Sequence, residues 1–178
     1  MHPLRISAPQ HRSGVVAADV AGTQVSFSSP DAELRPAAEA FAGAMWLPAL
    51  HGGVELVLAA PADKTWQTNL IWAAALARSW WGFGSSRLRT AGARPTSPPA
   101  DATVLCFTGG VDSFYSLLGG SPRPDAVVFA HGFDIGLGDE DRWRHAERGM
   151  RAVAAALGMQ AIVIRSDLRS HPGFASIS

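Results

Sequence analysis

An apolar run that ends in two glycines and resumes as an amphipathic pattern constrains the fold of this chain more than any other stretch. The run is Thr103–Phe107, and its β-branched, aromatic and apolar composition is typical of a strand buried on both faces, as in a parallel sheet. Gly109 and Gly110 lack Cβ atoms, so the backbone there can turn sharply and approach a ligand closely. The sequence therefore predicts a strand, a tight loop and a helix in succession.

The helix is expected to start at Asp112 and Ser113, because both residue types suit a helix N-terminus. Phe114, Leu117 and Leu118 recur at the three- and four-residue steps of its inner face. Free backbone N–H groups at the positive end of such a helix form an anion site, most often for phosphate. A Gly-Gly turn that binds no ligand is the plainer alternative.

The hexapeptide Thr108-Gly109-Gly110-Val111-Asp112-Ser113 resembles the Ser-Gly-Gly-x-Asp-Ser signature of the N-type ATP pyrophosphatases, the PP-loop superfamily. This family includes asparagine synthetase, GMP synthetase, argininosuccinate synthetase, tRNA thiolation enzymes and 7-cyano-7-deazaguanine synthase. Thr108 replaces the usual first serine but keeps a hydroxyl, and the resemblance covers about residues 103–168. The loop is not a Walker A motif, because the sequence contains no Gly-x-x-x-x-Gly-Lys-Ser/Thr.

The resemblance implies that this loop binds ATP with Mg²⁺. The implied cofactor-binding residues of the loop are the six from Thr108 to Ser113. Asp112 and Ser113 are the implied catalytic residues, and Asp112 is also the candidate ligand of Mg²⁺. By the same likeness, Phe129, Ala130 and His131 at the end of the next strand would contact the nucleotide. A hydrogen-bonded structural role for His131 is an equal alternative.

Further candidates for phosphate or substrate lie in two other loops of the same region. Asp134 would approach magnesium or ribose, or it is an ordinary loop aspartate. Arg165 and Arg169 would meet phosphate or a substrate carboxylate, or they are ordinary surface arginines. The acidic stretch 139–141 fits a solvated helix start better than a metal site.

Strand and helix patterns alternate through the second half of the chain. Ala126–Ala130 and Ala161–Ile164 read as buried strands, with a helix over Asp141–Leu157 between them that Gly158 ends. Such alternation predicts right-handed crossovers and a parallel sheet, with ligands beyond the carboxyl ends of the strands. We therefore expect an α/β fold with a parallel, doubly wound sheet like that of the adenine nucleotide alpha hydrolases, incomplete in this chain and preceded by a small α+β N-terminal unit.

The expected division of the chain is an N-terminal unit over residues 1–90, a proline- and serine-containing linker over 91–100, and the ATP-binding domain over 101–178. In the first unit, the runs 14–20 and 23–28 predict a hairpin, and Pro36 predicts a helix that runs to about Met45. Residues 54–59 predict a strand. Asp63 is expected to cap a helix over Lys64–Trp81 that ends at Gly82.

The inner face of that second helix is expected to consist of large and small apolar residues at helical spacing: Trp66, Leu70, Ala73, Ala74, Ala77 and Trp81. Five of the six tryptophans lie between Trp46 and Trp81. A base-stacking surface could also produce this density, but the helical spacing favours a core. Cys106, inside a predicted strand, is expected to be a small core residue rather than a nucleophile.

Composition limits the classes of partner. The 15 basic and 15 acidic residues of the 178 cancel, so binding to nucleic acid or to an anionic membrane gains no support from net charge. No apolar stretch approaches the roughly 20 residues that span a bilayer, and the N-terminus lacks the apolar core of a signal peptide. We expect a cytoplasmic protein that binds ATP and an unknown small-molecule acceptor. The oligomeric state is open, with a homo-oligomer among the alternatives.

The activity that the resemblance implies is adenylation of a carbonyl or carboxylate with release of pyrophosphate, followed by attack of an amine, ammonia or a sulfur donor. A nucleotide-binding module or inactive fragment is the first alternative, and a tRNA-modifying enzyme is the second. Only three strands of the family's larger sheet are identified before the chain ends. The strand Ala161–Ile164 is therefore expected to leave an edge or face exposed.

Overall fold

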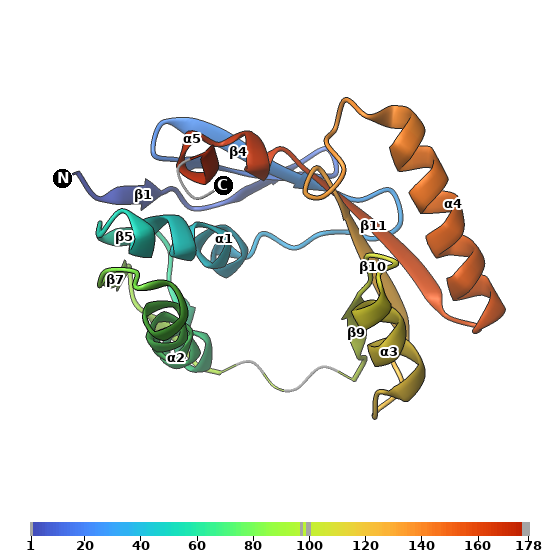
Figure 1. The fold of residues 1–178 in the computed structure, drawn as a ribbon. Coiled ribbons are helices and arrows are strands. Elements are labelled where there is room, and N and C mark those ends of the chain that lie inside the picture. Colours follow the sequence, from blue (N-terminus) through green and yellow to red (C-terminus); the bar gives the residue numbers. More distant parts are fainter. Residues whose placement is uncertain (1, 97, 99–100, 176–178) are drawn as a thin grey trace. The chain divides into compact units, whose positions relative to one another are not determined.

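The computed structural model describes residues 2–96, 98 and 101–175 (Figure 1). The chain forms two compact units, and each is described by itself. The N-terminal unit comprises residues 1–26, 35–98 and 168–178, and the loop-bearing unit comprises 27–34 and 99–167. Two segments are thus assigned differently from the expected division. Residues 27–34 belong with the loop-bearing unit, and residues 168–178 belong with the N-terminal unit.

The N-terminal unit contains a mixed sheet in which β7 (Leu88–Thr90), β5 (Leu56–Leu58), β1 (Leu4–Ile6), β3 (Val15–Val20) and β4 (Thr23–Ser28) are neighbours in this order. β2 (Gln10–Arg12) pairs with β3, and β6 (Ala62–Asp63) pairs with β8 (Ala93–Arg94). The helices are α1 (Ala38–His51), α2 (Lys64–Trp81) and the short C-terminal η1 (Leu168–Ser170) and α5 (Pro172–Ala175). The pairs β1–β5 and β5–β7 are parallel, whereas β1–β3 is antiparallel.

The predicted hairpin and the second helix are confirmed in detail. Ala21 and Gly22 both take positive φ between β3 and β4, as a tight two-residue hairpin turn requires. Asp63 Oδ1 accepts a hydrogen bond of 3.0 Å from Trp66 N–H at the start of α2, and Gly82 takes the left-handed conformation at its end. The helix expected near Pro36 instead begins at Ala38 and continues to His51 with Pro48 inside it. The strands β1, β2, β6, β7 and β8 were not predicted, since each has only two or three residues and shows no periodic pattern of its own.

The loop-bearing unit has a parallel arrangement of β9 (Val104–Cys106), β10 (Ala126–His131) and β11 (Gln160–Ser166), with β10 in the middle. The helices α3 (Val111–Gly119) and α4 (Glu140–Ala156) connect these strands (Figure 1). The last two residues of β4, Phe27 and Ser28, pair antiparallel with the end of β11. The predicted strand–helix alternation and parallel pairing are therefore confirmed, and the chain belongs to the α/β class.

The core of the loop-bearing unit lies between the strands and the two helices. It is made of apolar side chains from all of these elements: Phe107, Leu117, Val127, Phe129, Ile135, Trp143, Met150, Ala154 and Val163. α4 contributes its buried side with Trp143, Met150 and Ala154, which follow helical spacing. The opposite face of α4 is charged, so the helix has one apolar side, which packs on the sheet.

Two expectations about burial are wrong. Trp72 and Trp80 of α2 are 71% and 67% exposed, and Ala73 and Trp81 are exposed too, so most of the tryptophans are not core residues. Leu70, Ala74 and Ala77 do form the buried side of α2. Cys106 is exposed rather than buried, and it lies on the same face of β9 as the exposed Val104.

The edge of β11 is covered only in part. β10 pairs with the whole strand on one side, whereas on the other side β4 pairs only with Arg165 and Ser166, beyond the stretch Ala161–Ile164 that was expected to leave an edge or face exposed. Within that stretch, the Asp31 carboxylate accepts a hydrogen bond of 2.8 Å from the backbone N–H of Val163. Among the described residues of this unit, β9 also has a neighbouring strand on one side only, and its Val104 is exposed. No helix among the described residues is long and apolar enough to cross a membrane.

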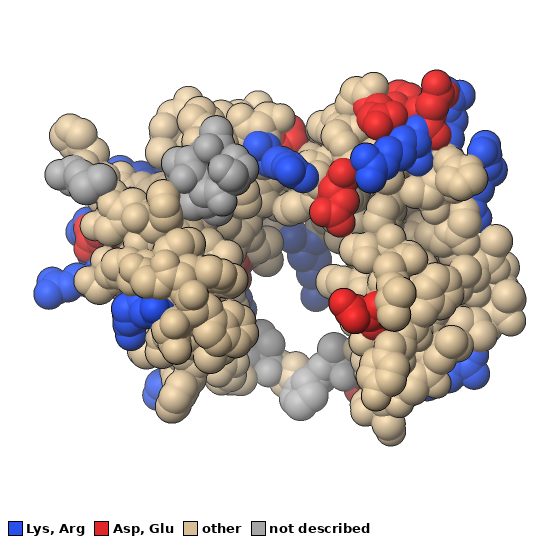
Figure 2. Space-filling view, in the orientation of Figure 1, with Lys and Arg blue, Asp and Glu red and all other residues tan. Residues whose placement is uncertain are grey.

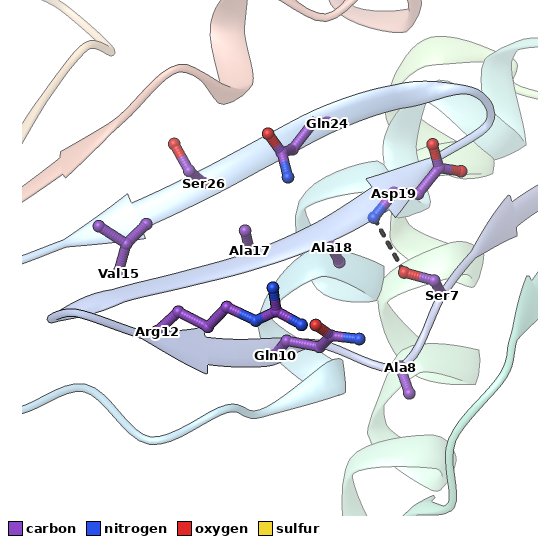
Figure 3. A pocket seen from close by; sticks show the side chains of 10 residues that line it. All are labelled: Ser7, Ala8, Gln10, Arg12, Val15, Ala17, Ala18, Asp19, Gln24 and Ser26. Carbon is purple, nitrogen blue, oxygen red and sulfur yellow. Dashed lines mark hydrogen bonds between the residues drawn. The ribbon is translucent and has the colours of Figure 1, made fainter.

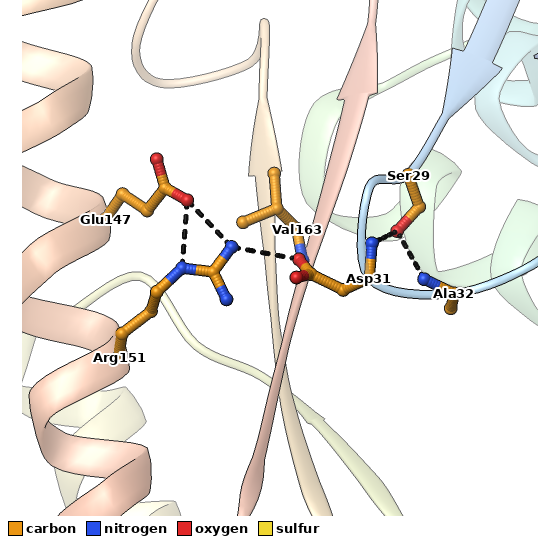
Figure 4. A network of polar contacts seen from close by, with 6 residues as sticks. All are labelled: Ser29, Asp31, Ala32, Glu147, Arg151 and Val163. Carbon is orange, nitrogen blue, oxygen red and sulfur yellow. Dashed lines mark hydrogen bonds and ion pairs between the residues drawn. The ribbon is translucent and has the colours of Figure 1, made fainter.

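Asp31 belongs to a network that fastens segment 27–34 to the loop-bearing unit (Figure 4). Its carboxylate lies 3.0 Å from a terminal nitrogen of Arg151, and the same guanidinium donates two hydrogen bonds to Glu147 one helical turn earlier on α4. Burial raises the pKa of Asp31, but the hydrogen bonds from Arg151 and Val163 outweigh it and lower the pKa below 3.8, the ordinary value. The pKa of Arg151 is raised by its hydrogen bonds to Asp31 and Glu147.

We expect Asp31→Asn to lower the free energy of unfolding at pH 7 by about 1 kcal/mol, because the ion pair is lost while the amide oxygen can still accept from Val163 N–H. A carboxylate with a lowered pKa in the folded state stabilises the fold above its unfolded pKa of 3.8 and loses this contribution as the pH falls through the folded pKa. The difference between the wild type and the variant should therefore shrink below about pH 4. Chemical denaturation at pH 7 and pH 3 measures the free energy of unfolding of both proteins. The exposed Asp134→Asn is the control, and an equal loss in that control would contradict the assignment.

Candidate functional site

The candidate site is the loop between β9 and α3, at the carboxyl edge of the parallel strands. Because β9, β10 and β11 are parallel, the segments that follow them lie at the same edge of this unit. Gly109 has φ +78°, a conformation that favours glycine, and a Cβ atom there would meet no atom within 4 Å. Gly110 precedes the first helical residue, Val111, and no side chain caps the helix. The loop therefore has the sharp turn and the open approach that the sequence predicted.

Backbone donors at the start of α3 are available to a ligand. Among the described residues, the N–H groups of residues 109–113 take no acceptor outside the helix, and the first bond of this turn runs from Phe114 N–H to Gly110 O at 3.1 Å. The first N–H groups of any helix lack partners within the helix, and the helix dipole adds positive potential there. An anion at this loop would satisfy these donors.

Two hydroxyl groups close the loop on itself. Thr108 Oγ1 lies 3.1 Å from Ser113 Oγ, and the Ser113 hydroxyl donates to Gly110 O at 3.0 Å. Ser113 is 9% exposed. These bonds fix the shape of the loop, so the hydroxyl groups of Thr108 and Ser113 position its backbone. Asp112 lies in the first turn of α3 and is exposed.

A pocket of about 260 Å³ borders this loop within the same unit. Its lining is mostly apolar and comes from the loop, β10 and both helices: Phe107, Thr108, Gly109, Phe114, Phe129, His145, Ala146, Gly149, Met150 and Val153. The rings of Phe107 and Phe114 meet edge to face with centroids 5.0 Å apart. The α4 residues of this pocket were not predicted. The sequence did contain a signal for this pocket. Ala146 and Gly149 are about one helical turn apart on α4, and their small side chains leave space beside the loop.

The end of β10 is buried by aromatic stacking. Trp143 of α4 lies parallel to the ring of His131 at a centroid distance of 4.0 Å and to Phe129 at 5.2 Å. His131 is 0% exposed, and its Nε2 lies 3.3 Å from the carbonyl oxygen of Gly136. Its Nδ1 has no hydrogen-bond partner among the described residues. The imidazole is therefore a core group that is closed to a ligand, whereas Phe129 lines the pocket beside the loop.

The loop after β10 turns at a glycine that no other residue can replace without rearrangement. Gly132 has φ +103°, and a Cβ atom there would lie 1.9 Å from the carbonyl oxygen of Ser166. Its N–H donates to Ile135 O at 2.9 Å, which leaves Asp134 exposed at the tip of the turn. Asp134 thus lies at the carboxyl edge of the strands, and among the described residues it belongs to no group of three or more side chains that could hold a metal ion.

The two candidate arginines are in different units. Arg165, on β11, lies 3.3 Å from Glu140 at the start of α4, and both side chains are about half exposed. Arg169 lies in η1 and belongs to the N-terminal unit. Asp139 accepts a hydrogen bond from Arg142 N–H and caps α4, as expected for a solvated helix start.

No group of three or more His, Cys, Asp or Glu side chains that could hold a metal ion occurs in the described part of the chain. A magnesium ion at the loop would therefore take most of its ligands from phosphate oxygens and water, with Asp112 as the nearby carboxylate. This is compatible with Mg²⁺, which usually keeps several waters when it binds with a nucleotide.

The N-terminal unit has a separate polar hollow of about 510 Å³ over one face of β3 (Figure 3). Gln10 and Arg12 of β2 and Gln24 and Ser26 of β4 flank it, and Ala17 lies at its centre. Ser7 Oγ accepts from Asp19 N–H at 2.9 Å at one end. This hollow is open and contains no buried charged group, so it gives no reason to place the chemistry there.

Comparisons with known protein families, with curated proteins and with solved structures found no match. The chemistry assigned to the loop therefore depends on its residues and their geometry.

Proposed function

We propose that the loop-bearing unit binds ATP with Mg²⁺ at Thr108–Ser113 and transfers the adenylyl group to a carbonyl or carboxylate acceptor. The observation that carries this proposal is the row of unpartnered N–H groups of residues 109–113 at the start of a nine-residue helix, next to the 260 Å³ pocket. Consecutive backbone donors on a positive helix end favour polyphosphate. The resemblance of the hexapeptide to the PP-loop signature supplies the type of reaction.

The apolar pocket is the proposed site of the base. Its lining by Phe107, Phe114 and Phe129 suits a flat ring, and Thr108 and Gly109 belong both to the pocket and to the loop. The base and the phosphates of one nucleotide would thus lie on the same side of the loop. Backbone groups of Ala130 at the end of β10 are the proposed polar contacts of the nucleoside.

The proposed reaction depends on which phosphates of ATP the loop binds. If the loop amides hold the β- and γ-phosphates, the α-phosphorus stays open to an acceptor oxygen. That oxygen forms a bond to the α-phosphorus, the bond to the bridging oxygen breaks, and pyrophosphate leaves with both bonding electrons. An amine, ammonia or a sulfur donor then displaces AMP. The role of the loop is electrostatic, since its donors stabilise charge on the leaving group, and Mg²⁺ would supply further neutralisation of that charge.

The runner-up is a nucleotide-binding module without turnover. It is favoured by the small number of ionisable side chains at the site, which are Asp112 in the loop and His145 in the lining of the pocket. The tRNA-modifying alternative needs a basic surface. On the face shown in Figure 2, basic and acidic side chains are interspersed among larger uncharged areas rather than gathered into one patch.

The first expected outcome is that Gly110→Val abolishes binding of ATP-Mg while the fold survives. A Cβ atom at Gly110 would meet only ordinary contacts of 3.7 Å and 4.0 Å with two hydroxyls, so the loop tolerates it, whereas the larger side chain blocks the approach to the amides. Isothermal titration calorimetry measures the affinity, and circular dichroism reports the fold. Gly119→Ala, at the far end of α3 in open space, is the matched control. Undiminished affinity in a folded Gly110→Val protein would refute the site.

The second expected outcome concerns the pocket. Gly149 lies within α4, and a Cβ atom there would meet no atom within 4 Å, so Gly149→Leu should fill the pocket without strain. We expect it to weaken ATP binding by about tenfold, which corresponds to about 1.4 kcal/mol. Inorganic triphosphate, which has no base, should bind the variant and the wild type equally. If the affinities for ATP and for triphosphate fell by the same factor, the base would not lie in this pocket.

The third expected outcome concerns the products. Attack at the α-phosphorus converts ATP to AMP and pyrophosphate, whereas kinase or ATPase chemistry yields ADP. Incubation with ATP labelled at the α-phosphate, in the presence of hydroxylamine as a general nucleophile and a panel of carboxylic acids, separates these products. ADP as the sole product would contradict the proposed chemistry. Saturable binding with no product would support the module without turnover.

A further inference from the structure

A groove of about 600 Å³ lies beside α2 in the N-terminal unit, and it is independent of the function proposed for the loop of the other unit. One wall is a stripe of α2, and the other is formed by residues of β7, β8 and the segment before them. The apolar lining consists of Trp46, Leu70, Ile71, Ala74, Leu88 and Ala93. Ile71 is exposed, and the ring of Trp46 forms part of the lining from α1. The groove is therefore an open apolar channel between a helix and a strand.

The strand beside this groove has a free edge. β7 is the last strand in the order of its sheet, with β5 on one side and no strand on the other among the described residues. Leu56 N–H donates to Arg87 O at 2.8 Å, and Ala91 N–H donates to Leu58 O at 3.1 Å. Because backbone groups alternate in direction along a strand, the N–H and C=O groups of Leu88 and Thr90 face away from β5. An exposed edge of this kind is a template for another strand.

The groove is also positively charged. Lys64 and Arg78 line it at opposite ends of α2, and neither has an ion-pair partner among the described residues. The sequence of α2 contains no acidic residue, and none lines the groove. The two cations are fourteen residues apart, which is about 21 Å along the helix axis. An extended strand covers this distance with about six or seven residues.

We propose that this groove binds an extended acidic segment of a partner protein, which adds as a strand to the free edge of β7. Main-chain hydrogen bonds to Leu88 and Thr90 provide affinity, and alternate side chains of the segment enter the apolar channel. Acidic side chains of the segment pair with Lys64 and Arg78. A small amphipathic anion has no peptide backbone, so it would leave the N–H and C=O groups at the edge of β7 without strand hydrogen bonds. A second copy of this chain would bring like charges together, because the groove and the edge carry only basic groups beside neutral ones.

The test uses a fluorescein-labelled peptide of eight residues in which glutamate and valine alternate. Fluorescence anisotropy with the full chain should show saturable binding, whereas the matched peptide of lysine and valine should not bind. A version of the acidic peptide with N-methyl groups on alternate amides cannot complete the strand pairing and should lose binding. Arg78→Glu and Lys64→Glu should each lower the affinity for the acidic peptide by about fivefold or more, as expected for reversal of one charge pair. Arg35→Glu, at an exposed position of the same unit outside the groove, is the control and should change affinity less than twofold.

Backbone amide chemical shifts provide a second measurement of peptide binding, which does not depend on fluorescence. In the complex, the amide resonances of Leu88 and Thr90 should shift more than those of the hairpin turn at Ala21 and Gly22. No saturable binding of the acidic peptide would overturn the proposal. Equal binding of the N-methylated peptide would overturn it in favour of a site for small amphipathic anions. A self-associating chain whose dimer the peptide does not dissociate would assign the edge to a second copy.

Discussion

The parallel pairing of β9 with β10 and of β10 with β11 is the constraint on which the candidate site depends. Parallel strands need crossover helices, and these helices return the chain so that every strand ends at the same edge. The start of α3, the turn at Gly132 and the cap of α4 are therefore near one another by topology. The stacking of Trp143 on His131 and Phe129 then fixes α4 against β10, and this packing leaves the pocket next to the loop.

Patterns that depend on local chemistry were predicted well from the sequence. The N-cap at Asp63, the end of α2 at Gly82 and the glycine turn at Gly109 each follow from one residue and its immediate neighbours. The order of strands and helices in the loop-bearing unit could be predicted for the same reason, because long apolar strands and one-sided helices have strong periodicity. The helix expected after the two glycines does begin there, at Val111.

Properties that depend on distant contacts could not be predicted. Helical spacing shows that α2 is apolar on several sides, but it cannot show which side faces α1, so Ala73 and Trp81 were misassigned to the buried side. Burial of His131 depends on Trp143, which is twelve residues away in another element. Segment 27–34 carries no pattern that would assign it to the loop-bearing unit. Its assignment depends on Asp31, which is held by Arg151 and by the N–H of Val163.

The strand that carries the loop is also the least supported strand of its unit. Within the described part of the chain, β9 has three residues, one neighbouring strand and an exposed Val104, and Val111, Tyr115 and Leu118 of α3 are exposed too. The position of Gly109 therefore depends on a few hydrogen bonds to β10, such as that from Phe107 N–H to Val128 O. A ligand that binds only the ordered loop would stabilise it by mass action, so occupancy of the site and order of β9 are linked. Residues that cover this edge and face of α3 would affect affinity at the loop without touching the ligand, since they would hold in place the strand from which the loop starts.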